Sequence, residues 1–492
     1  MTKIVLDGRE IEVDPRQPLI RACHDHGVDV PMYCYHPGLT PVGSCRICQV
    51  SVQQGDTPAR VMVACRTYPA EGMVVDTEAP KAHDARRECL EFLLKNHPLD
   101  CPICDKAGEC DLQDFAYDEG QEAGRTHEPR RKLDKRKSLG DVIVLDEERC
   151  ILCSRCVRFF EEVPKKPQLT VADLGSRSVI ATFMDQPLSG KYQGNIADLC
   201  PVGALTLHKF RFQARVWNLV KMASTCGECS RNCSTTVEVL RGASVERIRP
   251  RENPAVNTWW MCDIGRFAFD HVNAPDRLQG SQVREETGLA AVRNEEALCA
   301  VRDLLLARRE LLFVVSPWLT VEEGAVLLDY VKRFGVEPVF VSPLQNGEND
   351  DVLHTGDPCP NRRGLTQLGI VGLSAGEIAQ RMKRAQCVVL MGERVVDLVG
   401  RGAVAALPHA TAVAVFDCHA LDLPQVLVCV GIANWAERSG TWVNVDGIKG
   451  PISAVKPAPP NVRALGRHLE DLVKLSPRPD AMGTRATGAG AR

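Results

Sequence analysis

The chain has 492 residues, a length typical of about three domains, and its formal net charge of −3 gives no strong field that would attract nucleic acid or an anionic membrane. No stretch approaches the roughly 18 apolar residues of a membrane-spanning helix, and the opening MTKIVLDGREIEV lacks the regions of a signal peptide. The informative number is 22 cysteines, because dense cysteine in a chain of this size indicates metal binding in a reducing compartment rather than a disulfide scaffold.

The first 80 residues predict a strand-rich domain with one short helix. The opening segment alternates β-branched residues on both sides of Asp7-Gly8, a pair suited to the positive φ of a hairpin turn. The helical stretch PLIRACHDHG ends at Gly27, which fits the glycine that commonly follows a helix.

Residues 81–95 predict a second helix, which ends by His97 because Pro98 follows. The next segment, 119–140, contains the basic run GRTHEPRRKLDKRKSLG. Two explanations are open for this run: a solvated linker, or contact with an acidic partner.

Beyond residue 275, strands and helices alternate. The segments ELLFVVS, VEPVFVS, CVVLMG and TAVAVFD have strand patterns, whereas TVEEGAVLLDYVKRFG and AGEIAQRMKRA have helical ones. This alternation predicts an α/β domain with a parallel, doubly wound sheet. The final SPRPDAMGTRATGAGAR has too little apolar content to fold and predicts a disordered tail.

The first candidate ligand group, site 1, has the spacing C-x10-C-x2-C-x16-C and consists of Cys34, Cys45, Cys48 and Cys65. Plant-type [2Fe–2S] ferredoxins use C-x4-C-x2-C and a distant fourth cysteine, so the first gap departs from that pattern. The loop TPVGSCRIC carries a glycine where the backbone must pass close to the sulfides. A [2Fe–2S] cluster is predicted, with zinc as the alternative.

Site 2 has the spacing H-x3-C-x2-C-x5-C and consists of His97, Cys101, Cys104 and Cys110. A [4Fe–4S] cluster needs one ligand for each corner iron, and His97 is the nearby donor that completes the three cysteines. Alternatively, His97 is a helix C-terminal residue that interacts with the helix dipole. The otherwise incomplete set favours the ligand role, which would raise the cluster potential, as imidazole does in Rieske centres.

Site 3 combines the local run C-x2-C-x2-C with a distant Cys-Pro pair and consists of Cys150, Cys153, Cys156 and Cys200. Bacterial ferredoxins use C-x2-C-x2-C-x3-C-P, in which the Cys-Pro cysteine binds a different cluster from its neighbours. Here Phe160 occupies the fourth local position, so Cys200-Pro201 is the matching distant ligand. This spacing predicts a [4Fe–4S] cluster.

Site 4 has the spacing C-x2-C-x3-C-x28-C and consists of Cys226, Cys229, Cys233 and Cys262. The spacing fits a [4Fe–4S] cluster and a closed structural zinc site equally, and the three other sites favour iron–sulfur. Seven cysteines lie outside the sites, and we expect them to be small buried hydrophobes: Cys23, Cys89, Cys299, Cys359, Cys387, Cys418 and Cys429.

The sequence contains no fingerprint of a substrate site. No G-x-G-x-x-G follows a strand, no P-loop is present, and His208, His271 and His354 have no evident partner in the sequence. Metal sites without catalytic residues predict a protein that takes electrons from one partner and passes them to another.

Four stretches resemble the large iron–sulfur subunit (the G subunit) of respiratory complex I, the proton-pumping NADH:quinone oxidoreductase: CYHPGLTPVGSCRIC, HPLDCPICDKAGECDLQD, DEERCILCSRCVRF and CPVGAL. The segment RIRPRENPAVNTWWMCDIGRFAFDHVN resembles the N-terminal part of molybdopterin oxidoreductases, as that subunit does. The resemblance covers residues 1–275 with specific motifs and is looser afterwards, where ERSGTWVNVDG is similar to a late segment of the same superfamily.

The resemblance implies a series of domains along the chain. They are a β-grasp [2Fe–2S] ferredoxin-like domain (1–80), a [4Fe–4S] module with one histidine and three cysteine ligands (81–120), a [4Fe–4S] ferredoxin-like module (121–215), a molybdopterin-oxidoreductase-type [4Fe–4S] domain (216–275), an α/β domain (276–470) and a disordered tail (471–492). Members of the family are usually much longer, so the molybdopterin-type region would be trimmed. We therefore expect no molybdenum cofactor and a docking and packing role for the α/β domain.

The resemblance also implies an order of electron flow and a set of partners. Site 1 would accept electrons from the flavin/NADH-binding subunit, site 3 would follow, and site 2 would pass them to the ferredoxin-like [4Fe–4S] subunit on the way to quinone. Site 4 would lie off this path. The chain would sit with other peripheral-arm subunits on the cytoplasmic side of the inner membrane, with membrane contact only through the complex and no catalytic residue of its own.

An alternative is a cluster-bearing subunit of a formate dehydrogenase or an NAD-linked hydrogenase, which use a similar N-terminal array. A formate dehydrogenase would need a catalytic cysteine after site 4, and the flanks of Cys299, Cys359 and Cys387 do not support that role. A hydrogen-splitting centre would need an extra cysteine group such as TSCCP, which the sequence lacks.

Overall fold

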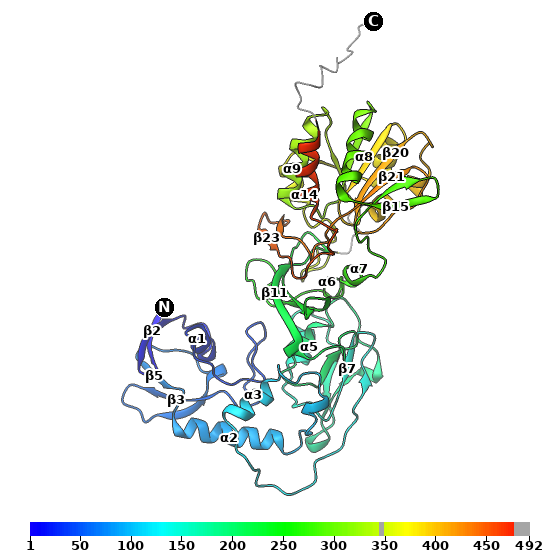
Figure 1. Ribbon diagram of the computed structural model, residues 1–492. Helices are drawn as coiled ribbons and strands as arrows, with labels where there is room; N and C mark the ends of the chain where they lie inside the picture. Colours follow the sequence, from blue (N-terminus) through cyan, green and yellow to red (C-terminus); the bar gives the residue numbers. More distant parts are fainter. Residues whose placement is uncertain (344–348, 477–492) are drawn as a thin grey trace. The chain divides into compact units, whose positions relative to one another are not determined.

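The computed structural model describes residues 1–343 and 349–476. The chain divides into two compact units, Met1–Leu219 (unit 1) and Val220–Arg492 (unit 2), each of which is described by itself. Figure 1 labels some of their helices and strands.

Unit 1 begins with a five-stranded sheet in the order β2-β1-β5-β3-β4. Its elements are β1 (Thr2–Leu6), β2 (Arg9–Val13), α1 (Leu19–Asp25), β3 (Gln49–Gln54), β4 (Arg60–Val63), η1 (Ala64–Arg66) and β5 (Met73–Asp76). A parallel β1–β5 pair lies among antiparallel neighbours, which confirms the β-grasp prediction. Asp7 and Gly8 both have positive φ at the hairpin turn, and Gly27 has positive φ after α1, as predicted.

The rest of unit 1 consists of short elements joined by loops. They are α2 (Pro80–Leu94), η2 (Cys101–Ile103), α3 (Asp111–Asp118), β6 (Lys137–Ser138), β7 (Ile143–Leu145), α4 (Arg155–Glu162), β8 (Leu169–Ala172), η3 (Gly175–Arg177), β9 (Val179–Thr182), η4 (Phe183–Asp185), α5 (Asn195–Leu199), β10 (Leu205–Leu207) and η5 (Val216–Asn218). Strands β10, β7 and β6 form a three-stranded sheet, and β8 pairs with β9. The helix predicted over 81–95 is α2, which ends before His97 as expected.

Unit 2 starts with a small antiparallel sheet that is followed by two short helices. These elements are β11 (Leu219–Thr225), β12 (Ser234–Leu240), β13 (Ser244–Pro250), α6 (Asp263–Arg266) and α7 (Asp270–Asn273). The sheet has the order β11-β12-β13, so the loop between β11 and β12, which carries the first three cysteines of site 4, lies at one end of the sheet.

An eight-stranded sheet in the order β15-β14-β21-β20-β19-β16-β17-β18 dominates unit 2. The elements are β14 (Ser281–Glu285), β15 (Gly288–Val292), α8 (Asn294–Leu306), β16 (Leu311–Val315), α9 (Val321–Lys332), β17 (Val339–Val341), α10 (Arg362–Gln367), β18 (Val371–Leu373), α11 (Ala375–Met382), β19 (Cys387–Met391), α12 (Val395–Val399), α13 (Arg401–Ala405), β20 (Ala412–Asp417), β21 (Val426–Gly431), β22 (Gly440–Val443), β23 (Lys449–Ile452) and α14 (Leu465–Leu475).

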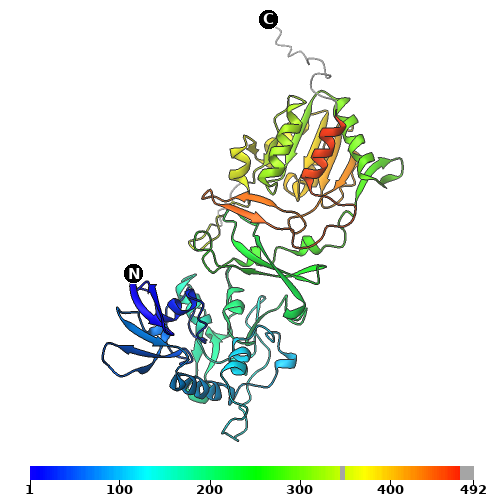
Figure 2. The same ribbon diagram turned by 60° about the vertical axis from the view of Figure 1, so that its left-hand side comes forward.

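The strands from β16 to β21 run parallel, whereas the hairpin β14–β15 adds an antiparallel edge. Successive residues of β16 enter two different apolar clusters: Phe313 packs with α8, α9 and α14, and Val314 packs with α11, α12 and α13. Figure 2 shows α14 in red beside the strands of this sheet. Helices cover both faces, which confirms the doubly wound α/β prediction; the antiparallel hairpin was not predicted.

Helix α14 continues to Leu475, past residue 470, where the sequence analysis placed the end of the α/β domain. Leu465, Leu469 and Leu472 are fully buried in the core, so apolar packing holds this last helix on the sheet. The predicted disordered tail beyond Ser476 lies outside the described residues.

Candidate metal centres

The four cysteines of site 1 come together because two of them flank a strand pair. Cys48 precedes β3 and Cys65 follows β4, and these strands pair antiparallel, so the Ala64 amide donates to the Cys48 carbonyl at 2.8 Å. The Cys34 amide donates to Cys45 Sγ at 3.4 Å, and the Cys34 thiol hydrogen-bonds to both Cys45 and Cys65. Cys45 is half-buried, and the other three are buried.

The thiols of site 1 polarise one another. The hydrogen bond with Cys45 lowers the pKa of Cys34, and the one with Cys65 lowers the pKa of Cys48. The same contacts raise the pKa of Cys45 and Cys65. Because thiolate is the form that binds iron, this convergent set fits a cluster with cysteine ligands.

Site 2 is assembled on two short helices. Cys101 opens η2, Cys104 follows its last residue, and Cys110 precedes α3 after a turn in which Gly108 has φ +85°. Cys101 is exposed, whereas Cys104 and Cys110 are buried, and burial raises the pKa of Cys110 to about 11. A cluster held here would therefore have one ligand at the protein surface.

His97 has the chemistry of a ligand rather than of a charged residue at a helix end. Burial lowers its pKa to about 4, so the imidazole is neutral at pH 7, and the helix-dipole alternative requires the charged form. Its Nδ1 atom is buried and makes no hydrogen bond within the described structure. A half-buried neutral imidazole whose buried Nδ1 is free to bind metal fits the fourth position of site 2.

The basic run after residue 119 is only partly a solvated linker. Lys135 binds Glu148 at 2.7 Å and also pairs with Asp100. Arg149 contacts the same Asp100 at 3.0 Å. These cations lie beside His97 and help to lower its pKa.

Site 3 is a small cavity of about 20 Å³ lined by all four predicted cysteines. The tight C-x2-C-x2-C run needs two left-handed residues, Leu152 (φ 53°) and Ser154 (φ 61°), and the Leu152 amide donates to Cys150 Sγ at 3.4 Å. Burial raises the pKa of Cys150 to about 12 and of Cys153 to about 11. Three buried cysteines and the half-buried Cys150 around one cavity fit a [4Fe–4S] cluster, whose binding would offset the cost of forming thiolates there.

Site 4 lies at the end of the small sheet in unit 2. The Cys226 amide donates to the Cys233 carbonyl at 2.9 Å, and burial raises the pKa of Cys262 to about 12, with a further contribution from Cys229. The backbone of Gly265 packs closely against this site, because a Cβ added to it would lie 2.5 Å from Cys226 Sγ.

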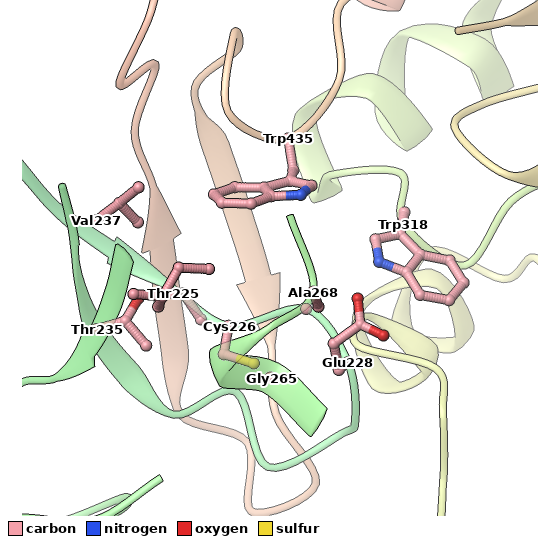
Figure 3. Close-up of a pocket in the computed structure, with 11 residues that line it drawn as sticks. Thr225, Cys226, Glu228, Thr235, Val237, Gly265, Ala268, Trp318 and Trp435 are labelled. Carbon is pink, nitrogen blue, oxygen red and sulfur yellow. The ribbon is translucent and has the colours of Figure 1, made fainter. Parts of the chain in front are cut away.

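A small pocket of about 10 Å³ adjoins Cys226. Figure 3 shows Cys226 on its wall, with Glu228, Trp318 and Trp435 around the space. The guanidinium carbon of Arg394 lies 4.6 Å from the ring centroid of Trp318. Arg394 also forms an ion pair with Glu228 at 3.2 Å, so the charged groups beside this pocket are paired with each other.

Two contacts that no sequence pattern revealed connect the sites of unit 1. A Cβ on Gly203, three residues after Cys200, would lie 2.2 Å from Cys104 Sγ, so site 3 and site 2 touch at this glycine. Arg155 bridges the loop of site 1 and the segment before Cys200, through the carbonyls of Tyr35 (2.6 Å) and Leu199 (3.1 Å). The position of Arg155 between Cys153 and Cys156 was the available sequence signal.

Five of the seven cysteines outside the sites lie in helices or strands; Cys359 and Cys418 do not. Burial was predicted for all seven, and Cys89 and Cys299 are only half-buried. Cys23, Cys89 and Cys299 lie on α1, α2 and α8, and Cys387 and Cys429 lie on β19 and β21. The prediction that His271 lacks a partner was wrong, because its Nε2 lies 2.9 Å from Glu393. His208 is 3.5 Å from the Ser138 hydroxyl.

Two features are missing from the described residues. No helix there is both long and apolar enough to cross a membrane. In the same parts of the chain, no group of three or more His, Cys, Asp or Glu side chains is arranged to hold a single metal ion.

Three family models match segments of unit 1. A 2Fe-2S iron-sulfur cluster binding domain matches residues 1–80. The NADH-ubiquinone oxidoreductase-G iron-sulfur binding region matches residues 86–125, and the ferredoxin-like domain of NADH-quinone oxidoreductase subunit 3 matches residues 140–206. The chain therefore contains 2Fe-2S and 4Fe-4S binding domains.

Curated relatives agree with these models. The G subunit of NADH-quinone oxidoreductase from Streptomyces coelicolor is 38% identical over 328 residues, 66% of this chain and 38% of the relative. The mitochondrial NADH-ubiquinone oxidoreductase 78 kDa subunit of Neurospora crassa is 38% identical over 358 residues (70% and 47%). NADH-quinone oxidoreductase subunit 3 of Thermus thermophilus is 36% identical over 365 residues (68% and 46%). The matches span less than half the length of these relatives.

Among solved structures, a chain of an NAD+-reducing [NiFe]-hydrogenase in the H2-reduced state aligns with 28% identity and a TM-score of 0.39. The alignment covers 44% of this chain and 91% of the other.

Proposed function

From the homology of this chain to the large iron–sulfur subunit of NADH-quinone oxidoreductases, we propose that it is an electron-transfer subunit of such a complex, which relays electrons one at a time through iron–sulfur clusters. The observation that carries the proposal is the gathering of three candidate sites in unit 1, with direct contacts between site 1 and site 3 and between site 3 and site 2.

Each site supplies the donors that its cluster needs. Site 1 would hold one [2Fe–2S] cluster, and sites 2, 3 and 4 would each hold one [4Fe–4S] cluster. When bound, the clusters supply one-electron transfer. The protein contributes the thiolates, the neutral imidazole of His97, and the burial of three of the four cysteines in each of sites 1 and 3.

The contacts within unit 1 support the order implied by the family. Site 1 adjoins site 3 through Arg155, and site 3 adjoins site 2 through Gly203, so a path from site 1 through site 3 to site 2 follows touching groups. On this proposal the flavin/NADH-binding subunit lies near site 1. The ferredoxin-like subunit lies near site 2, where Cys101 is exposed.

Location and further partners belong to the same proposal. The chain would be a peripheral subunit on the cytoplasmic side of the inner membrane, in contact with other peripheral-arm subunits. Site 4 would stabilise unit 2 rather than carry current, because all of its ligands lie in that unit.

Formate dehydrogenase is the competing function, and it needs a reactive cysteine beyond site 4. Cys359 is fully buried, and burial raises the pKa of its thiol to about 12, so it is a poor nucleophile or metal ligand at neutral pH. Cys387 is equally buried, within β19. Neither residue has the accessible, acidic thiol that such catalysis requires.

The test is the complex purified without oxygen, with iron, zinc and molybdenum quantified together and low-temperature EPR of the reduced sample. We expect this chain to contribute about 14 iron atoms, from one [2Fe–2S] and three [4Fe–4S] clusters, in addition to the iron of the ferredoxin-like [4Fe–4S] subunit, without molybdenum. Zinc in place of iron would overturn the electron-transfer proposal. Molybdenum together with formate oxidation would show that the chain belongs to the competing enzyme class.

A further inference from the structure

We propose that Arg155 and Arg158, on α4, are positioning residues that hold the loop of site 1 against site 3. Their fixed positive charges lie beside site 1 and favour its reduction. The inference rests on the proposed electron-transfer function. It assigns a role to two side chains that no cluster-binding motif includes.

Both arginines are placed by the cysteine motif of site 3. The left-handed Ser154 ends the C-x2-C-x2-C turn and starts α4, so Arg155 is the first helical residue. Arg158 follows at i+3, a spacing that puts both side chains on one side of the helix. The two residues are only 6% and 7% exposed.

Site 1 is held by three side chains of α4. Arg158 donates through Nη2 to the carbonyl of the ligand Cys34, and through Nη1 to the Thr40 carbonyl at 2.6 Å. Glu162 accepts from the Thr40 amide at 2.8 Å and from its hydroxyl at 3.0 Å. With the bond from Arg155 to Tyr35, α4 holds the first part of the site 1 loop, from Cys34 to Thr40.

The positive charges of these arginines are not neutralised by close carboxylates. The nearest acid to Arg155 is Asp111, at 3.9 Å, and the Arg155 Nε atom is buried without a hydrogen bond. Arg158 makes no ion pair within the described residues and binds carbonyl and hydroxyl oxygens. Buried cations of this kind are costly unless negative charge lies nearby.

Both adjoining sites provide negative charge, because Arg155 lies between the site 3 ligands Cys153 and Cys156, and Arg158 binds the carbonyl of the site 1 ligand Cys34. Four thiolates around iron make a site with net negative charge, and reduction adds one more electron, so a fixed cation beside the site stabilises the reduced state. Arginine suits this position better than lysine because its planar fork reaches two carbonyl oxygens at once. Arg158 therefore has two effects: it holds the site 1 loop in position, and its charge raises the reduction potential of site 1.

The experiment is an EPR-monitored redox titration of the assembled complex that carries Arg158→Met. We expect the equilibrium constant for reduction of site 1 to fall about tenfold, which is about 59 mV for a one-electron couple. Arg158→Lys should retain most of the potential because it keeps the charge. The matched control is Arg87→Met, which removes an exposed charge that pairs with Asp84 and should leave the potential unchanged.

An intact [2Fe–2S] signal with an unchanged midpoint in Arg158→Met would overturn the inference and leave the proposed function standing. A shift in Arg158→Lys as large as the one expected for Arg158→Met would also overturn it, because charge would then not be the cause. If Arg158→Met does not assemble, a wild-type midpoint in Arg158→Lys supports the role of charge and a tenfold fall opposes it. A wild-type complex without any [2Fe–2S] signal would instead contradict the proposed function.

Discussion

The two units of the chain hold their cysteines in different surroundings. Between the β-grasp domain and the end of unit 1, only α2 is longer than eight residues, and the ligands of sites 2 and 3 lie on short helices or on the loops between short elements. Unit 2 has an eight-stranded sheet with an apolar cluster on each face, and Cys387 and Cys429 are part of that core. Helices this short are marginal by themselves in water. The comparison teaches that unit 1 depends on its bound groups for structure, whereas most of unit 2 depends on apolar packing.

Removal of iron should have the largest effect and should separate the units. We expect the segment from 97 to 207 to lose its structure when iron is removed, because metal binding there is coupled to folding, while β16 to β21 remain folded. Hydrogen exchange of the metal-free complex measures both regions at once. Equal loss of protection in the two regions would contradict the comparison.

The next largest effect is expected from Gly203→Ala in unit 1. The new methyl group would lie 2.2 Å from Cys104 Sγ, so the site 2 cluster should be lost and turnover abolished. EPR of the reduced complex measures the loss, with the site 1 signal retained. The control is Gly124→Ala, whose Cβ meets nothing closer than 3.9 Å; if Gly203→Ala behaves like this control, the contact between sites 2 and 3 is wrong.

Truncation of a core side chain in unit 2 should lower the stability of that unit and leave the sites of unit 1 unchanged. Leu327 is fully buried on α9, and Leu327→Ala should cost about 2–5 kcal/mol of the free energy of unfolding. Thermal unfolding followed by circular dichroism gives the loss, and the visible absorbance of the clusters should persist beyond it. Leu306→Ala, at a 39% exposed position of α8, is the matched control with a smaller loss.

Site 4 offers the sharpest test within unit 2. Cys262→Ala should lower the stability of the unit with little loss of electron flux through the complex. Turnover and thermal stability are measured side by side, with Cys299→Ala as a control on α8 outside any site. Near-complete loss of turnover in a normally assembled complex would place site 4 on the electron path.

The smallest change is expected from His97→Cys. A cluster should still form, and its reduction midpoint should fall by on the order of 100 mV because thiolate adds negative charge that imidazole does not carry. Redox titration of the site 2 EPR signal measures the shift, and the exposed His127→Cys is the control. An unmoved midpoint would show that His97 is not a ligand.

Local patterns in the sequence were enough to predict several elements. The hairpin at Asp7-Gly8, the helix ending before His97 and the parallel strands of unit 2 follow from turn chemistry, proline sterics and periodicity. The partners of Lys135 and His271 were not predicted, because each lies on a segment distant in sequence. The antiparallel β14–β15 edge was not predicted, because the pattern of a short strand pair does not indicate which sheet the pair joins.

The sequence by itself determined the donors: tight cysteine spacings place several thiolates on one loop, and a short loop has few ways to fold around a metal. Only the tertiary structure decided how the donor groups relate to one another. Arg155 lies 120 residues from Tyr35, and the packing of Gly203 on Cys104 likewise joins distant segments. Such contacts arise when long loops close, and loop closure is fixed by the packing of the whole unit rather than by any local pattern.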